Sequence, residues 1–236
     1  MLKVAIIDFP GSNCRYDTLH VLKNVLNVDA RLIWHKEFDD NTYDAAILPG
    51  GFAYGDYLRA GIIAAFSPAM KTIKKMAAAG KPVLGICNGF QILVEAGLLP
   101  GALLRNSSLT FVCKWIHLRV ENNKSPLARG LTKGAILSLP IAHGEGRYFA
   151  DDDKLEEMKR NNQIIFRYVD KSGEVTEESN PNGSMDNIAG VCNPDGNVAG
   201  LMPHPERSSE KILSPTMTED GLSILRSVIE FAGGVQ

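Results

Sequence analysis

A cysteine stands between two glycines in the run Val-Leu-Gly-Ile-Cys-Asn-Gly at residues 83–89, where an apolar stretch passes into a helix-like pattern. This spacing is typical of the nucleophile elbow, Gly-x-nucleophile-x-Gly, with a thiol in place of the hydroxyl. The glycines allow a tight turn that lifts the Cys87 side chain clear of the sheet, and the N-terminus of the following helix favours its thiolate. The alternative is a buried cysteine that only fills space.

A nucleophilic cysteine needs a base, and His204 is the best candidate for it. This histidine lies in Met-Pro-His-Pro-Glu at 202–206, directly after a predicted strand, and the two prolines stiffen its loop. Glu206 is close enough to accept a hydrogen bond from the ring, hold its tautomer and stabilise imidazolium. Together, Cys87, His204 and Glu206 predict a catalytic triad. Three other histidines fit structural or surface positions: His20, His35 and His117.

A second histidine–carboxylate pair, His143 and Glu145, is the alternative base and acid. Glycines on both sides of Glu145 make that loop flexible or dependent on positive φ, which is a poorer platform than a loop held by prolines. We therefore interpret this pair as an element of a pocket or an interface.

The chain also offers donors for an oxyanion. Residues 47–52, Ile-Leu-Pro-Gly-Gly-Phe, predict a strand that ends in a glycine-rich turn. In elbow enzymes, one donor is the N–H after the nucleophile, here Asn88, and the other comes from a neighbouring loop, here Gly51 or Phe52. An ordinary turn is the alternative for the Pro-Gly-Gly segment.

Strands alternate with helices in the first half of the chain. The expected strands are 2–7, 31–34, 44–48 and 83–86, and the expected helices are 15–27 and 60–79, the latter stopped by Gly80. This alternation predicts an α/β fold with a mostly parallel central sheet flanked by helices on both faces.

The second half predicts an antiparallel strand extension followed by one helix. Its expected strands are 110–120, 135–139, 164–169, 188–192 and 198–202, of which the last two form a hairpin. A capping box from Thr216 to Glu219 is expected to begin the last helix, and Gly233-Gly234 to end it. With no linker evident, residues 1–236 are expected to form one domain.

Composition excludes several functional classes. The chain has 236 residues, 25 basic and 27 acidic, and a formal charge of −2, so neither a nucleic-acid partner nor a membrane surface is indicated. No apolar run approaches a membrane span, and the first residues lead directly into a strand. Four scattered cysteines are typical of reduced thiols, which predicts a cytoplasmic location.

Several motifs together resemble the class I, or triad-type, glutamine amidotransferases, and among them the glutaminase subunits of phosphoribosylformylglycinamidine synthase. These motifs are residues 9–14, 49–61, 85–91, 105–108, 143–147, 180–184 and 202–207. The resemblance covers nearly the whole chain. Ala53 departs from it, since the family often has serine there, and the acidic segment 151–162 reads as variable; neither touches the triad.

The resemblance implies a flavodoxin-like fold and hydrolysis of L-glutamine to glutamate and ammonia. It also implies that Gln91, the loop containing Asn106, Ser107 and Ser108, and His143 line the glutamine pocket. The ammonia would pass to a large synthetase subunit, with a small third subunit in many bacteria. That partner would use ATP and Mg²⁺ to convert formylglycinamide ribonucleotide to formylglycinamidine ribonucleotide in purine synthesis. No Walker-type motif is present in this chain, which is expected to bind no cofactor and no metal.

Two kinds of alternative remain open at this point. One is a different enzyme of the same class, either the partner of another synthetase or a γ-glutamyl hydrolase; the motifs at 49–61 and 180–184 argue against both. The other is a stress-response or chaperone-like protein that has the same sheet and elbow cysteine. Such proteins lack a His-Pro-Glu partner for the cysteine, so a His204→Ala variant of this chain with unchanged function would favour this alternative.

Overall fold

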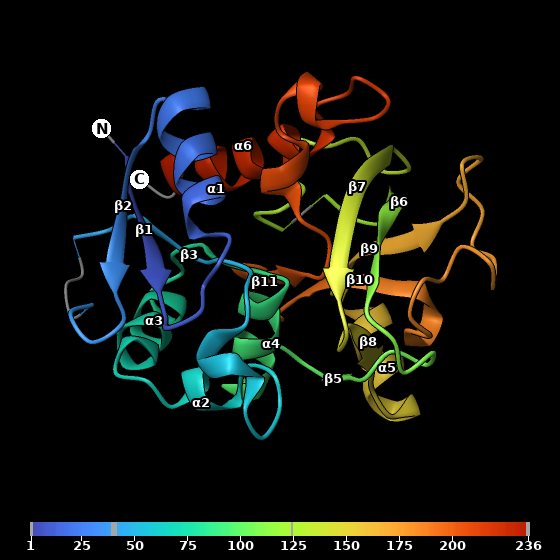
Figure 1. The fold of residues 1–236 in the computed structure, drawn as a ribbon, viewed down its shortest axis with the longest axis horizontal. Coiled ribbons are helices and arrows are strands. Elements are labelled where there is room, and N and C mark those ends of the chain that lie inside the picture. The colour runs from blue at the N-terminus through green and yellow to red at the C-terminus, as the bar shows by residue number, and fades with distance from the viewer. Residues whose placement is uncertain (1, 39–41, 124, 235–236) are drawn as a thin grey trace.

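The computed structural model describes residues 2–38, 42–123 and 125–234, and its main feature is one nine-stranded sheet (Figure 1). The strands of that sheet are β1 (Lys3–Asp8), β2 (Asp29–Trp34), β3 (Ala45–Leu48), β4 (Val83–Ile86), β6 (Val112–Val120), β7 (Ile136–His143), β9 (Ile164–Val169), β10 (Ile188–Cys192) and β11 (Val198–Leu201). Their order is β2-β1-β3-β4-β11-β10-β9-β6-β7. A separate two-stranded sheet, which the sequence pattern did not indicate, is formed by β5 (Ala102–Leu104) and β8 (Arg147–Phe149).

The sheet is parallel in its first part and antiparallel in its second. Strands β2, β1, β3, β4 and β11 run parallel, whereas β10, β9, β6 and β7 are each antiparallel to their neighbours. Every residue of β3, β4 and β11 is buried, as expected of parallel strands covered on both faces. The predicted fold class and the hairpin of β10 and β11 are confirmed.

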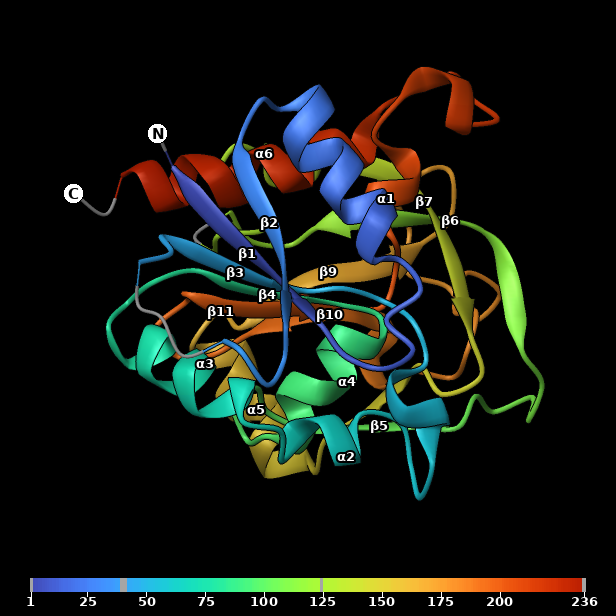
Figure 2. The same ribbon diagram turned by 60° about the vertical axis from the view of Figure 1, so that its left-hand side comes forward.

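Helices cover both faces of the parallel part. The helices of the described chain are α1 (Arg15–His20), which continues as a π-helical segment over Val21–Val25, α2 (Ile62–Ala65), α3 (Ala69–Ala78), α4 (Asn88–Glu95), α5 (Asp152–Arg160) and α6 (Asp220–Gly233). In Figures 1 and 2, α1 and α6 lie on one side of the sheet, and α2, α3 and α4 lie on the other. Short 3-10 segments span Ala53–Asp56, Met185–Asn187, Pro205–Ser208 and Lys211–Leu213. No helix among the described residues is long and apolar enough to cross a membrane.

The prediction of one continuous helix over 60–79 was wrong, because Pro68 divides it. Proline has no N–H to donate to the preceding turn and disfavours helical backbone in the residue before it. The first piece, α2, therefore ends at Ala65, and α3 begins after Pro68. Gly80 does follow the second piece, at φ +76°.

The predicted capping box at the last helix was also wrong. Helix α6 begins at Asp220, and its N-cap residue, Glu219, makes no side-chain capping bond. Instead, the Asp220 carboxylate accepts hydrogen bonds from the Ser138 N–H at 2.8 Å and the Thr218 hydroxyl at 3.2 Å. A hydrogen bond to β7 therefore stabilises the N-terminus of α6. The local spacing of residues 216–219 could not indicate this tertiary contact.

Candidate active site

Cys87 occupies a strained turn between β4 and α4. Its φ of 48° and ψ of −106° are unusual for a residue with a side chain, and its N–H donates to the Leu201 carbonyl at 2.8 Å. A Cβ on Gly89 would lie 1.9 Å from the Leu48 carbonyl oxygen, and one on Gly85 would lie 2.6 Å from the Gly89 backbone. Both glycines are therefore required by close backbone approach, and the turn has the form of a nucleophile elbow.

His204 follows β11, the strand next to β4, and both its backbone and its ring are fixed by hydrogen bonds. Its backbone is extended, with φ −103° and ψ 92°, and its N–H donates to the Pro140 carbonyl at 2.9 Å. Its ring Nδ1 lies 2.6 Å from Glu206 Oε1, and both side chains are buried. Because Glu206 occupies Nδ1, the ring nitrogen left for chemistry is Nε2, which has no hydrogen-bond partner among the described residues.

The parallel pairing of β4 and β11 brings the sulfur and the imidazole to one sheet edge. Leu201 pairs with Ile86, so Cys87 and His204 both follow the carboxyl ends of adjacent strands. Both residues line one cavity, and the Cys87 thiol also lies 3.9 Å from the Ala142 carbonyl. Burial lowers the pKa of His204, but the Glu206 charge and then Cys87 outweigh it, so the pKa is well above its ordinary value.

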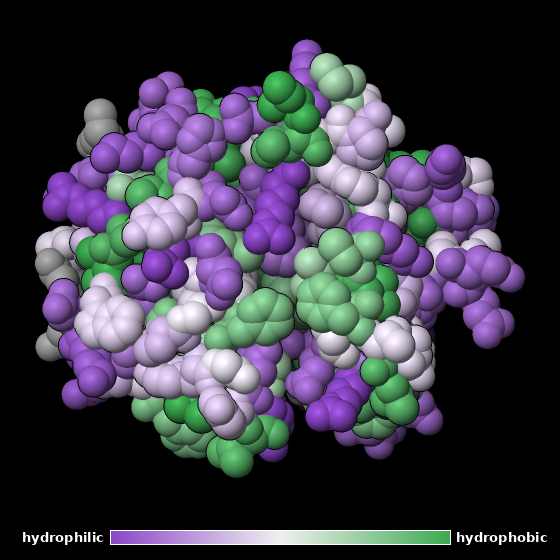
Figure 3. Space-filling view, in the orientation of Figure 1, coloured by the Kyte–Doolittle hydropathy of each residue, from purple (hydrophilic) through white to green (hydrophobic). Residues whose placement is uncertain are grey.

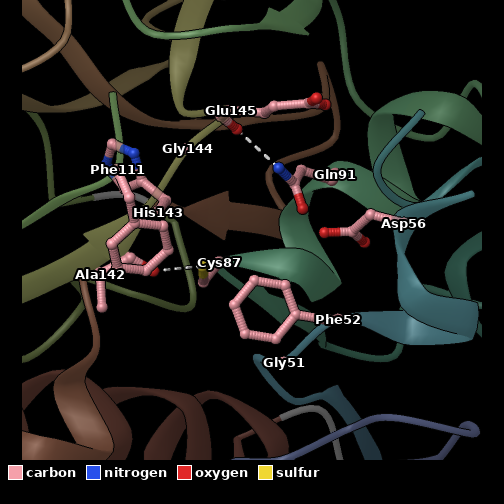
Figure 4. Close-up of a pocket in the computed structure, with 10 residues that line it drawn as sticks. All are labelled: Gly51, Phe52, Asp56, Cys87, Gln91, Phe111, Ala142, His143, Gly144 and Glu145. Atoms are coloured by element: carbon pink, nitrogen blue, oxygen red, sulfur yellow. Dashed lines mark hydrogen bonds between the residues drawn. The ribbon is translucent and has the colours of Figure 1, made fainter. Parts of the chain in front are cut away.

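A second cavity of about 170 Å³ adjoins the other side of Cys87 (Figure 4). Its lining residues are Gly51, Phe52, Asp56, Cys87, Gln91, Phe111, Ala142, His143, Gly144 and Glu145. The Phe52 and Phe111 rings, with centroids 6.4 Å apart, lie beside the sulfur.

Comparisons with known proteins identify the family. The sequence model of the CobB/CobQ-like glutamine amidotransferase domain matches residues 1–230. The chain is 52% identical over 230 residues to phosphoribosylformylglycinamidine synthase subunit PurQ of Methanosarcina barkeri, with 98% of each chain covered. It is 53% identical over 228 residues to the subunit of the same name from Aquifex aeolicus, covering 97% of this chain and 99% of the relative. The chain belongs to the PurQ family of glutamine amidotransferases.

Solved structures agree with membership of the PurQ family. A chain of the structure described as PurLQS from Thermotoga maritima is 43% identical, with a TM-score of 0.83 and 98% of both chains covered. The glutaminase domain of Trypanosoma brucei CTPS is 14% identical, with a TM-score of 0.60 over 99% of this chain and 94% of that one. The second likeness concerns the fold alone.

The structure distinguishes between the two predicted oxyanion donors of the PurQ-family glycine loop. The Phe52 N–H already donates to the Gly11 carbonyl at 2.9 Å. The Gly51 N–H has no acceptor among the described residues, and Gly51 has a φ of +147° that favours glycine. Gly51 is therefore the available donor, whereas a role for Phe52 would require breaking an existing bond. Asn88 begins α4 next to the sulfur, where backbone N–H groups lack helical partners.

The predicted glutamine-pocket residues divide into two groups. Gln91 and His143 line the 170 Å³ cavity. Asn106 lies behind them: its Oδ1 is 3.1 Å from His143 Nδ1, and its Nδ2 donates to the His143 carbonyl at 2.9 Å. Ser107 and Ser108 are exposed and, within the described chain, line neither cavity beside Cys87. Their predicted contact with substrate is therefore not apparent in this conformation.

Gln91 and His143 are both constrained by their neighbours. The Gln91 amide donates to the Glu145 carbonyl at 2.6 Å and accepts from Asn88 Nδ2 at 2.9 Å. Burial, and then the charge of His204, lower the pKa of His143 to about 4, so this ring is neutral at physiological pH. The predicted interpretation of the His143–Glu145 segment as part of a pocket agrees with its position.

Sequence reasoning missed Asp56 as a pocket residue, although the 49–61 motif contained it. Asp56 has a φ of 54°, lines the cavity and accepts a hydrogen bond from Asn88 Nδ2 at 3.2 Å. Burial, and then the charge of Glu145, raise its pKa to about 6. This side of the cavity is therefore acidic and favours a cationic group.

The Pro-Gly turn before Cys14 allows it to lie at the same end of the sheet as Cys87, and because no partner base is evident in the sequence we expected a structural role; the structure places a base beside its sulfur. Its sulfur, His204 and Glu206 each offer a ligand atom within 4.8 Å of the others. Arg207 Nη2 donates to the sulfur at 3.1 Å. Burial raises the pKa of the Cys14 thiol and outweighs the opposing influence of His204 nearby. The residues around Cys14 do not indicate its contact with His204 and Glu206, because these two residues lie far from it along the chain.

Proposed function

We propose that this chain is the glutaminase subunit of phosphoribosylformylglycinamidine synthase, which hydrolyses L-glutamine and supplies the ammonia to a synthetase subunit. One observation carries the catalytic assignment. Cys87, on a strained elbow, and the Glu206-bound imidazole of His204 follow adjacent parallel strands and face one cavity. Family membership at more than half identity over the full chain supports the choice of pathway.

The reaction begins when the Cys87 thiolate attacks the side-chain amide carbon of glutamine. The N–H groups of Gly51 and Asn88 stabilise the oxyanion, and one such donor is worth about 3 kcal/mol in other enzymes. His204 Nε2 gives its proton to the departing ammonia, because an amide anion would be a very poor leaving group. The neutral imidazole then takes a proton from water, which hydrolyses the γ-glutamyl thioester to glutamate and frees Cys87.

Glutamine carries an α-ammonium as well as the reacting amide, and the acidic side of the cavity suits that cation. Asp56 and Glu145 both line this side, and their mutual repulsion would be relieved by a positive charge between them. Gln91 and His143 border the same space, with Asn106 holding the His143 ring. Ser107 and Ser108 would reach substrate only after their loop moves.

Cys14 is the other sulfur beside His204, so the nucleophile needs a direct test. Its raised pKa keeps Cys14 as a thiol, and it lies outside the cavity that holds Asp56 and Gln91. Cys87 lines both cavities and heads an eight-residue helix. We therefore assign the nucleophilic role to Cys87.

A synthetase partner fits the surroundings of the site. At the cavity mouth, Phe52 is 46% exposed and Phe111 is 54% exposed, and the neighbouring Leu58 and Leu109 are more exposed still. Apolar patches interrupt the hydrophilic surface on the face of the molecule that Figure 3 shows. Exposed apolar side chains grouped at a site mark interaction surfaces. The 43% identity of this chain to a chain of the PurLQS structure from Thermotoga maritima supports a place in a multi-subunit complex.

Further parts of the proposal follow from the family. The synthetase subunit would use ATP and Mg²⁺ to convert formylglycinamide ribonucleotide, with a small third subunit in the complex. Residues 1–236 would act as one amidotransferase domain, since the family model spans 1–230 and strands of both chain halves share one sheet. A reducing cytoplasm would keep the Cys87 thiol free.

The test compares Cys87→Ala with the matched variant Cys14→Ala. In the assembled enzyme, Cys87→Ala should abolish glutamine-dependent product formation and retain the reaction fed by ammonium salts. Cys14→Ala should retain both reactions, and mass spectrometry should find the glutamyl thioester on Cys87. Glutamine-dependent turnover by Cys87→Ala, or a thioester on Cys14, would show that the nucleophile is wrongly assigned.

A further inference from the structure

Asn88 contributes its backbone N–H to the proposed oxyanion site, and its side chain makes three further hydrogen bonds. Its Oδ1 accepts from the Ala53 N–H at 2.9 Å. Its Nδ2 donates to Asp56 Oδ1 at 3.2 Å and to Gln91 Oε1 at 2.9 Å. Asn88 is only 1% exposed, so bulk water does not compete for these bonds. The buried amide therefore connects the start of α4 to the glycine-rich loop at residues 49–58.

The loop at residues 49–58 has a backbone conformation that its own residues disfavour. Tyr54 and Asp56 have φ values of 55° and 54°, in the left-handed region where side chains are strained. Such a conformation persists only where surrounding contacts hold it. On one side, the N–H groups of Phe52 and Tyr54 donate to carbonyls of the segment that follows β1. On the other side, the loop is bonded to the Asn88 amide.

The orientation of the Asn88 amide is fixed by its neighbours. The Gln91 amide donates its own N–H to the Glu145 carbonyl at 2.6 Å, so its Oε1 faces Asn88. Because Gln91 Oε1 and the Asp56 carboxylate both accept, the Asn88 group that faces them must be the donor. Its oxygen is then left for the Ala53 N–H. Position 88 therefore requires one donor and one acceptor on the same short side chain.

Gly51, whose N–H is the available oxyanion donor, lies two residues before Ala53 in this loop. Ala53 is 3% exposed, so without the Asn88 amide its N–H would be a buried donor that needs a new partner. Leaving such a donor unpaired is unfavourable, and the loop would shift to pair it. We propose that the Asn88 side chain is a positioning residue that fixes the Gly51 N–H relative to the Cys87 sulfur. Asn88 thus supplies one oxyanion donor through its backbone and places the other through its side chain.

This role rests on the proposed glutamine hydrolysis, so the test measures kcat and KM for that reaction in the assembled enzyme. Asn88→Ala should lower kcat about 10- to 100-fold, because misplacing a group by about 1 Å can cost about 100-fold. KM should change much less, since the oxyanion forms only after glutamine is bound.

A conservative variant should recover the rate. Asn88→Asp keeps an acceptor for the Ala53 N–H, and two carboxyl groups as close as this one and Asp56 share one proton. The shared proton preserves the hydrogen bond to Asp56 and the net charge of the pair. The kcat of Asn88→Asp should therefore stay within about threefold of the wild type.

Asn197 provides the matched control, because it is also buried and also bridges two segments. It is 3% exposed, and its Nδ2 donates to the carbonyls of Ala77 and Lys81 at 2.7 and 3.1 Å. It precedes β11, at the end of the sheet opposite to Cys87. Asn197→Ala should lower the unfolding temperature and leave kcat and KM unchanged.

Hydrogen exchange gives a second readout that does not depend on turnover. Deuterium uptake by a peptide covering residues 49–58 should be faster in Asn88→Ala than in the wild type and in Asn197→Ala. If Asn88→Ala does not fold, Asn88→Ser replaces it, because its hydroxyl keeps a polar group at the site but is too short to reach the loop.

Three results would overturn the positioning role. They are a kcat of Asn88→Ala equal to that of Asn197→Ala, a raised KM with an unchanged kcat, and an unchanged deuterium uptake by residues 49–58. The second result would assign the Asn88 side chain to substrate binding instead. A wild type that does not hydrolyse glutamine would refute the proposed function itself, whereas active Asn88 variants beside an active wild type would refute only the positioning role.

Discussion

Replacing Glu206 by glutamine tests how the carboxylate supports the imidazole. Glu206→Gln keeps the shape of the side chain but removes the charge that lies 2.6 Å from His204 Nδ1. Both side chains are at most 3% exposed, so solvent hardly screens the interaction. A hydrogen bond to a charged group contributes about 1.5–3 kcal/mol. If the imidazolium loses this support in the transition state, the rate should fall about 10- to 150-fold.

The assay is steady-state ammonia release as a function of glutamine concentration and pH. We expect the loss in kcat, with KM little changed, because Glu206 contacts the base and does not line the substrate cavity. The Glu206 charge helps to raise the pKa of His204 above its ordinary value. Removing this charge lowers the pKa of His204, so the imidazolium loses its proton at a lower pH. The alkaline limb of the pH profile of kcat should therefore shift to lower pH.

Two results would refute this reasoning. One is a Glu206→Gln variant whose kcat falls less than about threefold, since this is below the smallest effect of a buried charged hydrogen bond. The other is an unchanged pH profile in a variant that has lost activity, which would assign Glu206 a purely structural role. Thermal unfolding of the variant separates a folding defect from either result.

Three other substitutions follow from the same geometry. Gly89→Ala should cost several kcal/mol of unfolding free energy or prevent folding, since its Cβ would lie 1.9 Å from the Leu48 carbonyl oxygen; denaturant unfolding measures this. Gly50→Ala would place a Cβ 2.7 Å from His204 Cε1, so ammonia release should fall while the fold survives. Asp56→Asn should stabilise the protein by about 1 kcal/mol above pH 6, with the gain absent below pH 4.

The raised pKa of Asp56 explains why Asp56→Asn should stabilise the protein at high pH and not at low pH. Asp56 has a pKa of about 6 when folded, against an ordinary value of 3.8, so the fold disfavours its charged form. The stability present below pH 4 is therefore lost as the pH rises through 6, and asparagine avoids this loss. Measuring the unfolding free energy of wild type and Asp56→Asn at pH 4 and pH 7 checks this prediction. An equal change in stability at both pH values would contradict the raised pKa of Asp56.

Gly233→Ala is the control for the two glycine variants, because no atom lies within 4 Å of its added Cβ.

Much of the fold could be predicted because local patterns and tertiary contacts agree there. Strand β9 was expected at 164–169 and found at Ile164–Val169, and the alternation before the elbow correctly indicated the parallel half. The break at Pro68 was visible in the sequence and should have been given more weight. The β5–β8 pair could not be foreseen in the same way, because its strands have three residues each and lie far apart in the chain.

The sequence by itself determined the chemical groups and the turns that hold them. The elbow glycines, the prolines around His204 and the Glu206 two residues away act over a few bonds, so their spacing was enough to predict a triad. Only the tertiary structure decided what surrounds that triad. The contact of Cys14 with His204, the proximity of Asp56 to Glu145 and the engagement of the Phe52 N–H by Gly11 all join segments that are distant along the chain. Such contacts depend on strand order and loop packing, which residue spacing does not encode.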